Sequence, residues 1–104
     1  PRGSARAFGK MARVRLLWSD RAISDLQQIA DFIALDSPAS ATSFVTKVVE
    51  AVSTLEAFPD AGRVLPEYGE SSLRKLIFRN YRVVYRTDEQ SVTIVTVFHG
   101  SKPL

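Results

Sequence analysis

The chain is 104 residues long, which suits one hydrophobic core and leaves little material for a second. Hydrophobic residues make up 45% and charged residues 24%, a balance typical of globular proteins rather than of disordered or fibrous ones. No apolar run reaches the roughly eighteen residues needed to cross a bilayer, and the absence of cysteine excludes disulfide bonds and thiolate metal sites. We therefore expect a single domain that works in the cytoplasm.

The first ten residues read as the remnant of an expression tag. They begin Pro-Arg-Gly-Ser and end just before a methionine, so we expect 1–10 to lie outside the fold and 11–104 to form one domain. Three of the 14 basic residues fall in this stretch: Arg2, Arg6 and Lys10. Without them, 11 basic residues balance the 11 acidic ones, and the formal charge falls from +3 to zero. Bulk charge therefore gives no argument for nucleic-acid binding.

Charge is unevenly distributed along the chain. Residues 19–58 hold two basic and six acidic residues, whereas 63–104 hold seven basic and four acidic ones. The first stretch carries a charge of −4 and the second +3. Two interpretations remain open: helices collect acidic residues near their N-termini, where the macrodipole favours them, or the second stretch builds a clustered basic face.

The N-terminal third predicts a strand followed by a helix. Residues 13–18, Arg-Val-Arg-Leu-Leu-Trp, are β-prone and end in apolar side chains. Ser19 and Asp20 then offer helix-capping oxygens. Apolar residues recur afterwards with a period near 3.6, which predicts an amphipathic helix. Its stripe consists of Ala22, Leu26, Ile29 and Ile33, widened by Ile23 and Ala30. Core burial is the ordinary role of such a stripe, and a groove for a partner is the alternative.

A second helix is predicted from Pro38 to Phe58. Ser37 can cap it, and proline is well placed at the first helical position. Ala41, Phe44, Val45, Val48, Val52 and Leu55 form its apolar face. The breaker sequence Pro-Asp-Ala-Gly at 59–62 ends it. Because the connection between the helices is short, we expect an antiparallel hairpin.

After residue 62 the apolar period changes to two, which predicts strands. The segments 73–78, 81–87 and 92–99 are rich in Val, Ile, Tyr, Phe and Thr and are separated by short polar turns. Residues 64–69 fit either a short extra strand or a loop. The predicted fold is α+β: an N-terminal strand, an antiparallel two-helix hairpin, then a three-stranded antiparallel meander, with the helices packed on one face of the sheet.

Several of these segments together resemble the ParE-type toxins of the ParE/RelE toxin–antitoxin superfamily. In the N-terminal part the resemblance lies in a strand ending Trp-Ser, in the pattern Ala22-x-x-Asp25-Leu26-x-x-Ile29-x-x-Phe32-Ile33, and in Ala41, Phe44, Leu55, Phe58-Pro59 and Gly62-Arg63. The C-terminal part matches more specifically, through Leu73-Arg74-Lys75-Leu76, Tyr81-Arg82-Val83-Val84-Tyr85-Arg86 and Val95-x-Val97-Phe98-His99-Gly100. The resemblance covers the chain from residue 13 to residue 100.

This resemblance implies a toxin of a type II toxin–antitoxin system, of the kind that serves plasmid stabilization. Its partner would be a cognate antitoxin whose C-terminal segment wraps around the toxin. ParE-like members are associated with poisoning DNA gyrase, and RelE-like members with cutting messenger RNA on the ribosome. The chain departs from the pattern after His99-Gly100, where an Arg and an acidic residue usually follow. Lys102 supplies the charge of that arginine but not its planar fork.

The candidate target-binding residues are basic: Arg63, Arg74, Arg82 and Arg86. Arg82 and Arg86 should share one face of a strand with Val84, while Tyr81, Val83, Tyr85 and Thr87 take the other. Arginines so placed can hold phosphate or a partner's carboxylates, and the solvated side of a half-buried sheet is the alternative. Arg74 matches the family's arginine and is the first candidate for a specific role.

An RNA-cleaving function would need a base, an acid and cations on the phosphate. The residues that could supply them are Arg74, Arg82, Tyr85 and His99. Histidine is the one side chain type in this chain with an ordinary pKa near neutrality, so an acid–base mechanism would centre on His99. Alternatively, His99 ends the last strand and forms local hydrogen bonds before the turn at Gly100. The two tyrosines are more typical of core-edge positions than of catalysis.

No cofactor or metal is expected, because the chain has a single histidine, no cysteine, no glycine-rich phosphate loop and no nucleophile triad pattern. Together with this poor catalytic inventory, the resemblance to ParE-type toxins implies a non-enzymatic inhibitor of DNA gyrase. The alternatives are a ribosome-dependent endoribonuclease and an inactive member that only binds antitoxin. Such a small domain should leave an apolar groove or an open sheet edge for the antitoxin, and a homodimer is possible.

Overall fold

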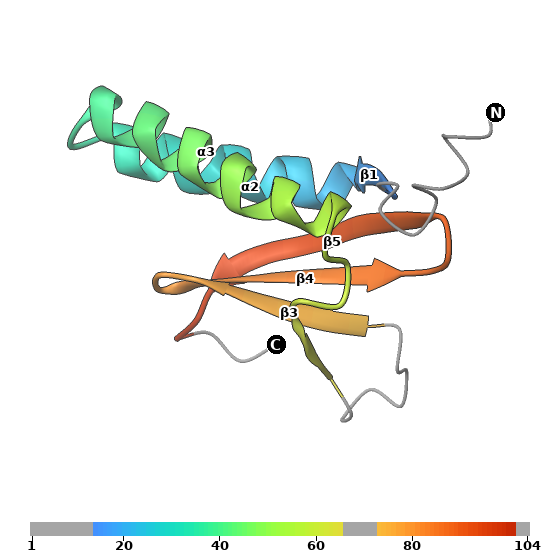
Figure 1. Cartoon of the computed structure of the whole chain (residues 1–104). Coiled ribbons are helices and arrows are strands. Elements are labelled where there is room, and N and C mark those ends of the chain that lie inside the picture. Colours follow the sequence, from blue (N-terminus) through green and yellow to red (C-terminus); the bar gives the residue numbers. More distant parts are fainter. Residues whose placement is uncertain (1–13, 66–72, 102–104) are drawn as a thin grey trace, which may run out of the picture.

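The computed structural model describes residues 14–65 and 73–101, and in them the predicted α+β order is found. The elements are β1 (Arg15–Trp18), α2 (Asp20–Ala34), α3 (Pro38–Ser53), the 3-10 turn η2 (Thr54–Glu56), β2 (Arg63–Val64), β3 (Leu73–Phe78), β4 (Tyr81–Thr87) and β5 (Ser91–His99). The two helices form an antiparallel hairpin that lies along one face of the sheet (Figure 1).

Both helices begin where the sequence predicts. The Ser19 hydroxyl accepts a hydrogen bond from the Ala22 amide, and the Ser37 hydroxyl accepts one from the Ser40 amide. Each serine satisfies an amide that has no partner within its helix. Pro38 stands at the start of α3, where its missing amide hydrogen costs nothing.

The second helix ends earlier than predicted. Its α-helical part stops at Ser53, and Thr54–Glu56 tighten into a 3-10 turn, so the prediction of a helix to Phe58 was wrong. The hydroxyls of Ser53 and Thr54 donate to backbone carbonyls three residues earlier. Such local bonds compete with the α-helical pattern, and the tighter turn carries Leu55 into the core.

The strands form one five-stranded mixed sheet in the order β1-β5-β4-β3-β2. The meander β3-β4-β5 is antiparallel, as predicted, and its turn Arg79-Asn80 holds Arg79 at a φ of 55°. The first strand pairs in parallel with β5, from Arg15 beside Ser91 to Trp18 beside Ile94. Of the stretch 64–69, Val64 belongs to β2 and the part beyond Leu65 lies outside the described residues.

The register between β4 and β5 slips by one residue at Val84 and Tyr85. Val84 lies opposite Thr96, but Tyr85 lies opposite Ile94, so Val95 is the extra residue of a β-bulge. On the helix side of the sheet, β5 therefore contributes Val92 and Ile94 before the bulge and Val97 after it. The bulge shifts the alternation by one residue, so that Val97 rather than Thr96 faces the core.

The core lies between the helices and the sheet. Its buried members are Ala22, Phe44, Val48, Val52, Leu55, Val83, Tyr85, Val92, Ile94 and Val97. Leu26, Ile29 and Ile33 of the predicted α2 stripe pack against them. Ile23 does not: its side chain is 54% exposed, so widening the stripe to include it was wrong. No helix in the described part of the chain is long and apolar enough to span a membrane.

Candidate partner-binding surfaces

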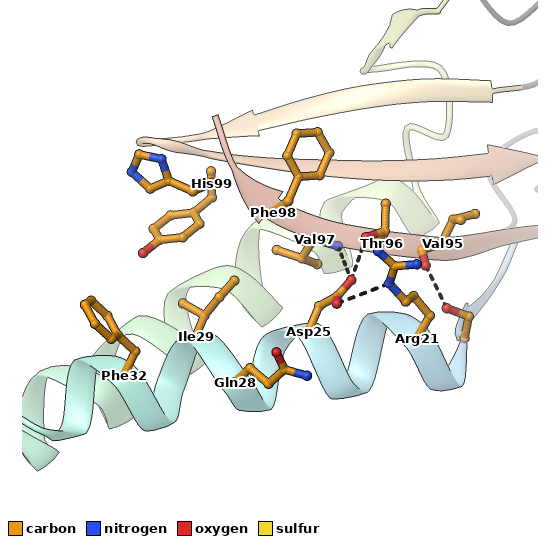
Figure 2. A pocket seen from close by; sticks show the side chains of 12 residues that line it. Arg21, Asp25, Gln28, Ile29, Phe32, Val95, Thr96, Val97, Phe98 and His99 are labelled. Carbon is orange, nitrogen blue, oxygen red and sulfur yellow. Dashed lines mark hydrogen bonds and ion pairs between the residues drawn. The ribbon is translucent and has the colours of Figure 1, made fainter. Parts of the chain in front are cut away.

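A groove opens beside the last strand because β1 is short. The first strand covers β5 only from Ser91 to Ile94. Among the described residues, no strand pairs with the rest of β5, up to His99, on that side. Helix α2 runs alongside this uncovered length and encloses a cavity of about 1010 Å³ (Figure 2). The groove is lined by Ser19, Arg21, Asp25, Gln28, Ile29, Phe32, Tyr81 and the strand residues Val95–His99.

The end of the groove near β1 is closed by hydrogen bonds from α2 and its cap. One carboxylate oxygen of Asp25 accepts from the Thr96 hydroxyl at 2.5 Å and from the Val97 amide at 3.1 Å, and the other oxygen pairs with Arg21. The Ser19 hydroxyl donates to the Val95 carbonyl. These polar groups take the place of a neighbouring strand, so no further strand can pair with β5 there without displacing them.

The other end of the groove is apolar and open. Phe32 projects from α2 with 72% of its surface exposed, and Ile29 lies one turn before it (Figure 2). Across from them, the Tyr81 ring lies 5.0 Å from Phe44 and 5.3 Å from His99, measured between ring centroids. Leu35, at the end of α2, is 81% exposed. Large apolar side chains gathered at a concave surface are typical of a site that another chain covers.

His99 ends the last strand with local hydrogen bonds. Its Nδ1 accepts from the Ser101 amide at 3.1 Å and lies 2.7 Å from the Ser101 hydroxyl. Because a backbone amide can only donate, Nδ1 is the acceptor in the hydrogen bond from the Ser101 amide. His99 thus stands at the end of β5 and forms local hydrogen bonds with Ser101.

The opposite face of the sheet is basic. Cross-strand partners share a face, and the core residues of β4 and β5 face the helices, so their alternates face away. On this side, called the outer face below, β2, β3 and β4 place Arg63, Leu73, Lys75, Ile77, Arg82, Val84 and Arg86. Three of the four predicted target-binding arginines are thus on one surface, and Lys75 joins them.

Arg74, the fourth, points to the helix side. It pairs across the sheet with Tyr85, and its guanidinium donates to the carbonyls of Gly62 at 2.7 Å and Asp60 at 3.2 Å. It also approaches the Asp60 carboxylate at 3.6 Å. Its side chain is only 21% exposed. The first candidate for a specific role thus holds the loop that follows η2.

Tyr85 anchors the same loop from within the core. Its hydroxyl donates to the Pro59 carbonyl at 2.8 Å and accepts from the Gly62 amide at 2.7 Å. Burial raises the pKa of Tyr85 above its usual value near 10, and the hydrogen bond from Gly62 opposes this. A Cβ at Gly62 would lie 2.6 Å from the Tyr85 hydroxyl oxygen. Pro59, Asp60, Gly62, Arg74 and Tyr85 are called the loop clamp below.

The four residues proposed for RNA cleavage do not meet at one place. Arg74 and Tyr85 belong to the loop clamp, Tyr85 is fully buried, and Arg82 lies on the outer face. His99 follows Val97 on the helix side and lines the groove. Among the described residues no three His, Asp or Glu side chains cluster as metal ligands would.

The sequence of the chain matches a family model. Residues 16–104 match the model of the ParE toxin of the type II toxin–antitoxin system parDE, which is most of the chain. The chain belongs to the ParE toxin family.

Two individual relatives are named as toxins. The chain is 34% identical over 92 residues to the protein named "Putative toxin Y4kP" of Sinorhizobium fredii, covering 86% of this chain and 92% of that protein. It is 28% identical over 89 residues to Toxin RelE2 of Caulobacter vibrioides, covering 85% and 97%.

Two solved structures share the fold. One is a chain of the chromosomal ParDE system of P. aeruginosa, with a TM-score of 0.70 and 24% identity over 86% of this chain and 97% of the other. The second belongs to the toxin–antitoxin complex RelBE2 of Mycobacterium tuberculosis, with a TM-score of 0.62 and 22% identity over 85% and 99%. The two-helix, five-stranded fold is therefore that of ParE and RelE toxins.

The structure explains why Arg82 and Gly100 of the ParE signature occur together. Arg82 donates to the Tyr81 carbonyl at 3.1 Å, and its guanidinium lies under Gly100, where a Cβ would come within 2.7 Å of Cζ. Glycine after the histidine gives this arginine room. Sequence reasoning missed the roles of Asp25 and Phe32, although both stand in the family pattern. A phenylalanine one position outside the apolar stripe was the available signal for Phe32.

Proposed function

We propose that this ParE-family chain is a toxin that inhibits DNA gyrase by binding it in the cytoplasm, and that a cognate antitoxin neutralises it. The observation that carries the non-enzymatic part is the separation of the candidate catalytic groups. RNA cleavage needs the base, the acid and the phosphate-binding cations within hydrogen-bond reach of one reacting phosphate. Arg82 and His99 project from opposite sides of the sheet, and Tyr85 is buried with both of its hydrogen bonds committed to the loop.

The antitoxin segment is proposed to occupy the groove between α2 and β5. Exposed Phe32 and the ring of Tyr81 offer an apolar seat for a partner's side chains. Pairing of an added strand is blocked near Asp25, so the part of the partner at this end would dock through its side chains, as an amphipathic helix does in an apolar groove. The ParDE system that shares this fold supports an antitoxin partner.

The second candidate is a ribosome-dependent endoribonuclease. It is favoured by the relative named RelE2 and by the fold shared with a chain of RelBE2. In that case the arginines of the outer face would bind the RNA phosphates, and His99 would have to reach them from the edge of the sheet.

A supercoiling assay with purified DNA gyrase tests the leading proposal. We expect the chain to stop supercoiling in a dose-dependent way and the antitoxin to restore it. His99→Ala should inhibit as well as the wild type, because binding without chemistry has no use for an acid–base group. Unimpaired gyrase at a large excess of the chain would contradict the proposal.

Mapping of transcript ends after induction in cells tests the second candidate. New ends within coding regions that disappear in His99→Ala would establish the nuclease and remove the gyrase proposal. Absence of both effects, with antitoxin binding retained, would identify a family member that only binds its antitoxin.

A further inference from the structure

The turn between β3 and β4 holds an arginine in a backbone conformation that suits glycine. Only Arg79 and Asn80 join the two strands, and Phe78 pairs with Tyr81 across the turn. Arg79 has a φ of 55°, and in the described part of the chain it is the one non-glycine residue with a positive φ. At the first position of a two-residue hairpin turn, glycine is favoured for such a φ because it has no Cβ. Stability alone would favour glycine here, so the arginine indicates a role outside the fold.

The Arg79 guanidinium is available to a ligand. Its side chain is exposed and, within residues 14–65 and 73–101, forms no ion pair and no hydrogen bond. Its Cζ lies 5.1 Å from the centroid of the Phe78 ring. That ring packs edge-on against Phe44 of the core, with 6.0 Å between centroids. A ring fixed in this way supports the guanidinium and leaves its N–H donors for a partner.

The surroundings of Arg79 favour a protein partner over a nucleic acid. Phe78, Tyr81 and His99 lie side by side across β3, β4 and β5. Aromatic rings beside an arginine are typical of the centres of protein interfaces. Stacking of bases needs open ring faces, whereas here the rings pack edge-on against their neighbours and Arg79 covers the Phe78 ring. The protein group that best matches a guanidinium fork is a carboxylate.

The turn lies outside the groove proposed for the antitoxin. Arg79 is not among the residues that line the groove, and its supporting residue Phe78 belongs to β3, which β4 separates from β5. Figure 1 shows the turn at the end of the sheet, below the helix hairpin. The turn therefore suits a second protein partner, and under the proposed function that partner is DNA gyrase.

We infer that the β3–β4 turn is a contact site for DNA gyrase, in which Arg79 binds a carboxylate on the protein surface of the enzyme. The inference rests on the proposed function. It adds the toxin residue that recognises the target and the charge of the surface that this residue meets.

The test compares Arg79→Gly, Arg79→Gln and the parent in supercoiling assays with purified DNA gyrase. We expect both variants to need at least about tenfold more protein for half-inhibition, because the charged hydrogen bonds to the carboxylate are lost. Arg79→Lys should fall between them and the parent, since it keeps the charge without the planar fork. The matched control is Arg15→Gln, which removes an exposed arginine of β1 and should inhibit like the parent.

Melting temperatures separate a role in binding from a role in the fold. Arg79→Gly should melt at or above the temperature of the parent, because glycine relaxes the turn. A clear fall in its melting temperature would show that the arginine serves the fold and would overturn the inference. Inhibition by Arg79→Gly equal to that of the parent would overturn the inference alone and leave the proposed function standing. A parent without effect on gyrase would remove both.

Two binding measurements identify the partner of the turn. Surface plasmon resonance with DNA-free gyrase should show the same loss in Arg79→Gln as the supercoiling assay. A loss seen only when gyrase holds DNA would overturn the inference in favour of a phosphate contact. Weaker binding of the antitoxin by Arg79→Gln, with gyrase inhibition unchanged, would overturn it in favour of an antitoxin contact.

Discussion

The loop clamp and the groove lie toward different ends of β4, and each contains a tyrosine from that strand. At the loop clamp, Tyr85 is fully buried and its hydroxyl makes two short hydrogen bonds to backbone that is distant in sequence. At the groove, Tyr81 packs edge-on against His99, and the exposed Phe32 lines the same groove. A family signature thus mixes residues that hold the fold with residues that a partner can reach, and only their surroundings tell them apart.

Of the substitutions considered, Gly62→Ala is expected to destabilise the loop clamp most. The new Cβ would lie 2.6 Å from the Tyr85 hydroxyl and 2.7 Å from the Lys75 backbone carbonyl, and the carbonyl cannot move without disturbing β3. Steric strain and a lost hydrogen bond together should lower the free energy of unfolding by about 3 kcal/mol. Urea denaturation measures this, and Ala61→Gly is the neighbouring control. A change below about 1 kcal/mol would show that the loop is free to shift.

Tyr85→Phe should have the next largest effect. It leaves the Gly62 amide and the Pro59 carbonyl without their partner, which should cost about 2 kcal/mol. Tyr81→Phe removes a hydroxyl from the groove instead and should cost under about 1 kcal/mol. Equal losses in the two variants would remove the contrast between the two regions.

The same tyrosine predicts a pH dependence. Burial raises the pKa of Tyr85 in the folded chain, whereas the unfolded chain releases this proton near pH 10. The stability from this group is therefore fully present below pH 10 and is lost as the pH rises beyond it. Denaturation between pH 9 and 11 should show a steeper loss in the wild type than in Tyr85→Phe. Parallel curves would contradict the assignment.

Asp25→Asn tests the polar end of the groove. The amide can accept fewer of the bonds from Thr96, Val97 and Arg21, and it loses the ion pair. We expect a loss of about 1 kcal/mol in the free energy of unfolding. Amide hydrogen exchange at Val97 should speed up in this variant while that at Val83 stays slow. Unchanged protection at Val97 would argue against the carboxylate as the group that covers the strand edge.

Phe32→Ser should have the smallest effect on the fold. Its ring is largely exposed, so the free energy of unfolding should change by less than about 0.5 kcal/mol. If the groove receives the antitoxin, affinity measured by calorimetry should fall at least about tenfold. Phe58→Ser, 67% exposed next to the loop clamp, is the matched control. Equal effects of the two serines on affinity would place the antitoxin elsewhere.

Local patterns in the sequence account for the elements, because a cap or a period is read from neighbouring residues. Ser19 and Ser37 start the helices as predicted, and β3 and β4 have their predicted limits. The end of α3 was missed because hydroxyls at Ser53 and Thr54 compete with the helix through bonds that periodicity does not register. The burial of Ile23 was predicted wrongly because an apolar stripe indicates which side of a helix is buried, but not how wide the buried surface is.

By itself the sequence determined the fold class, the number and kind of the main elements and the family, since these follow from periodicity, capping chemistry and an ordered set of short motifs. Tertiary structure decided what the charged and aromatic residues do. Pairing of β1 with only part of β5 created the groove, and the cross-strand register sent Arg74 to the loop while it placed Lys75 with Arg63 on the outer face. Register and pairing depend on contacts between residues distant along the chain, and a single sequence carries no local signal for them.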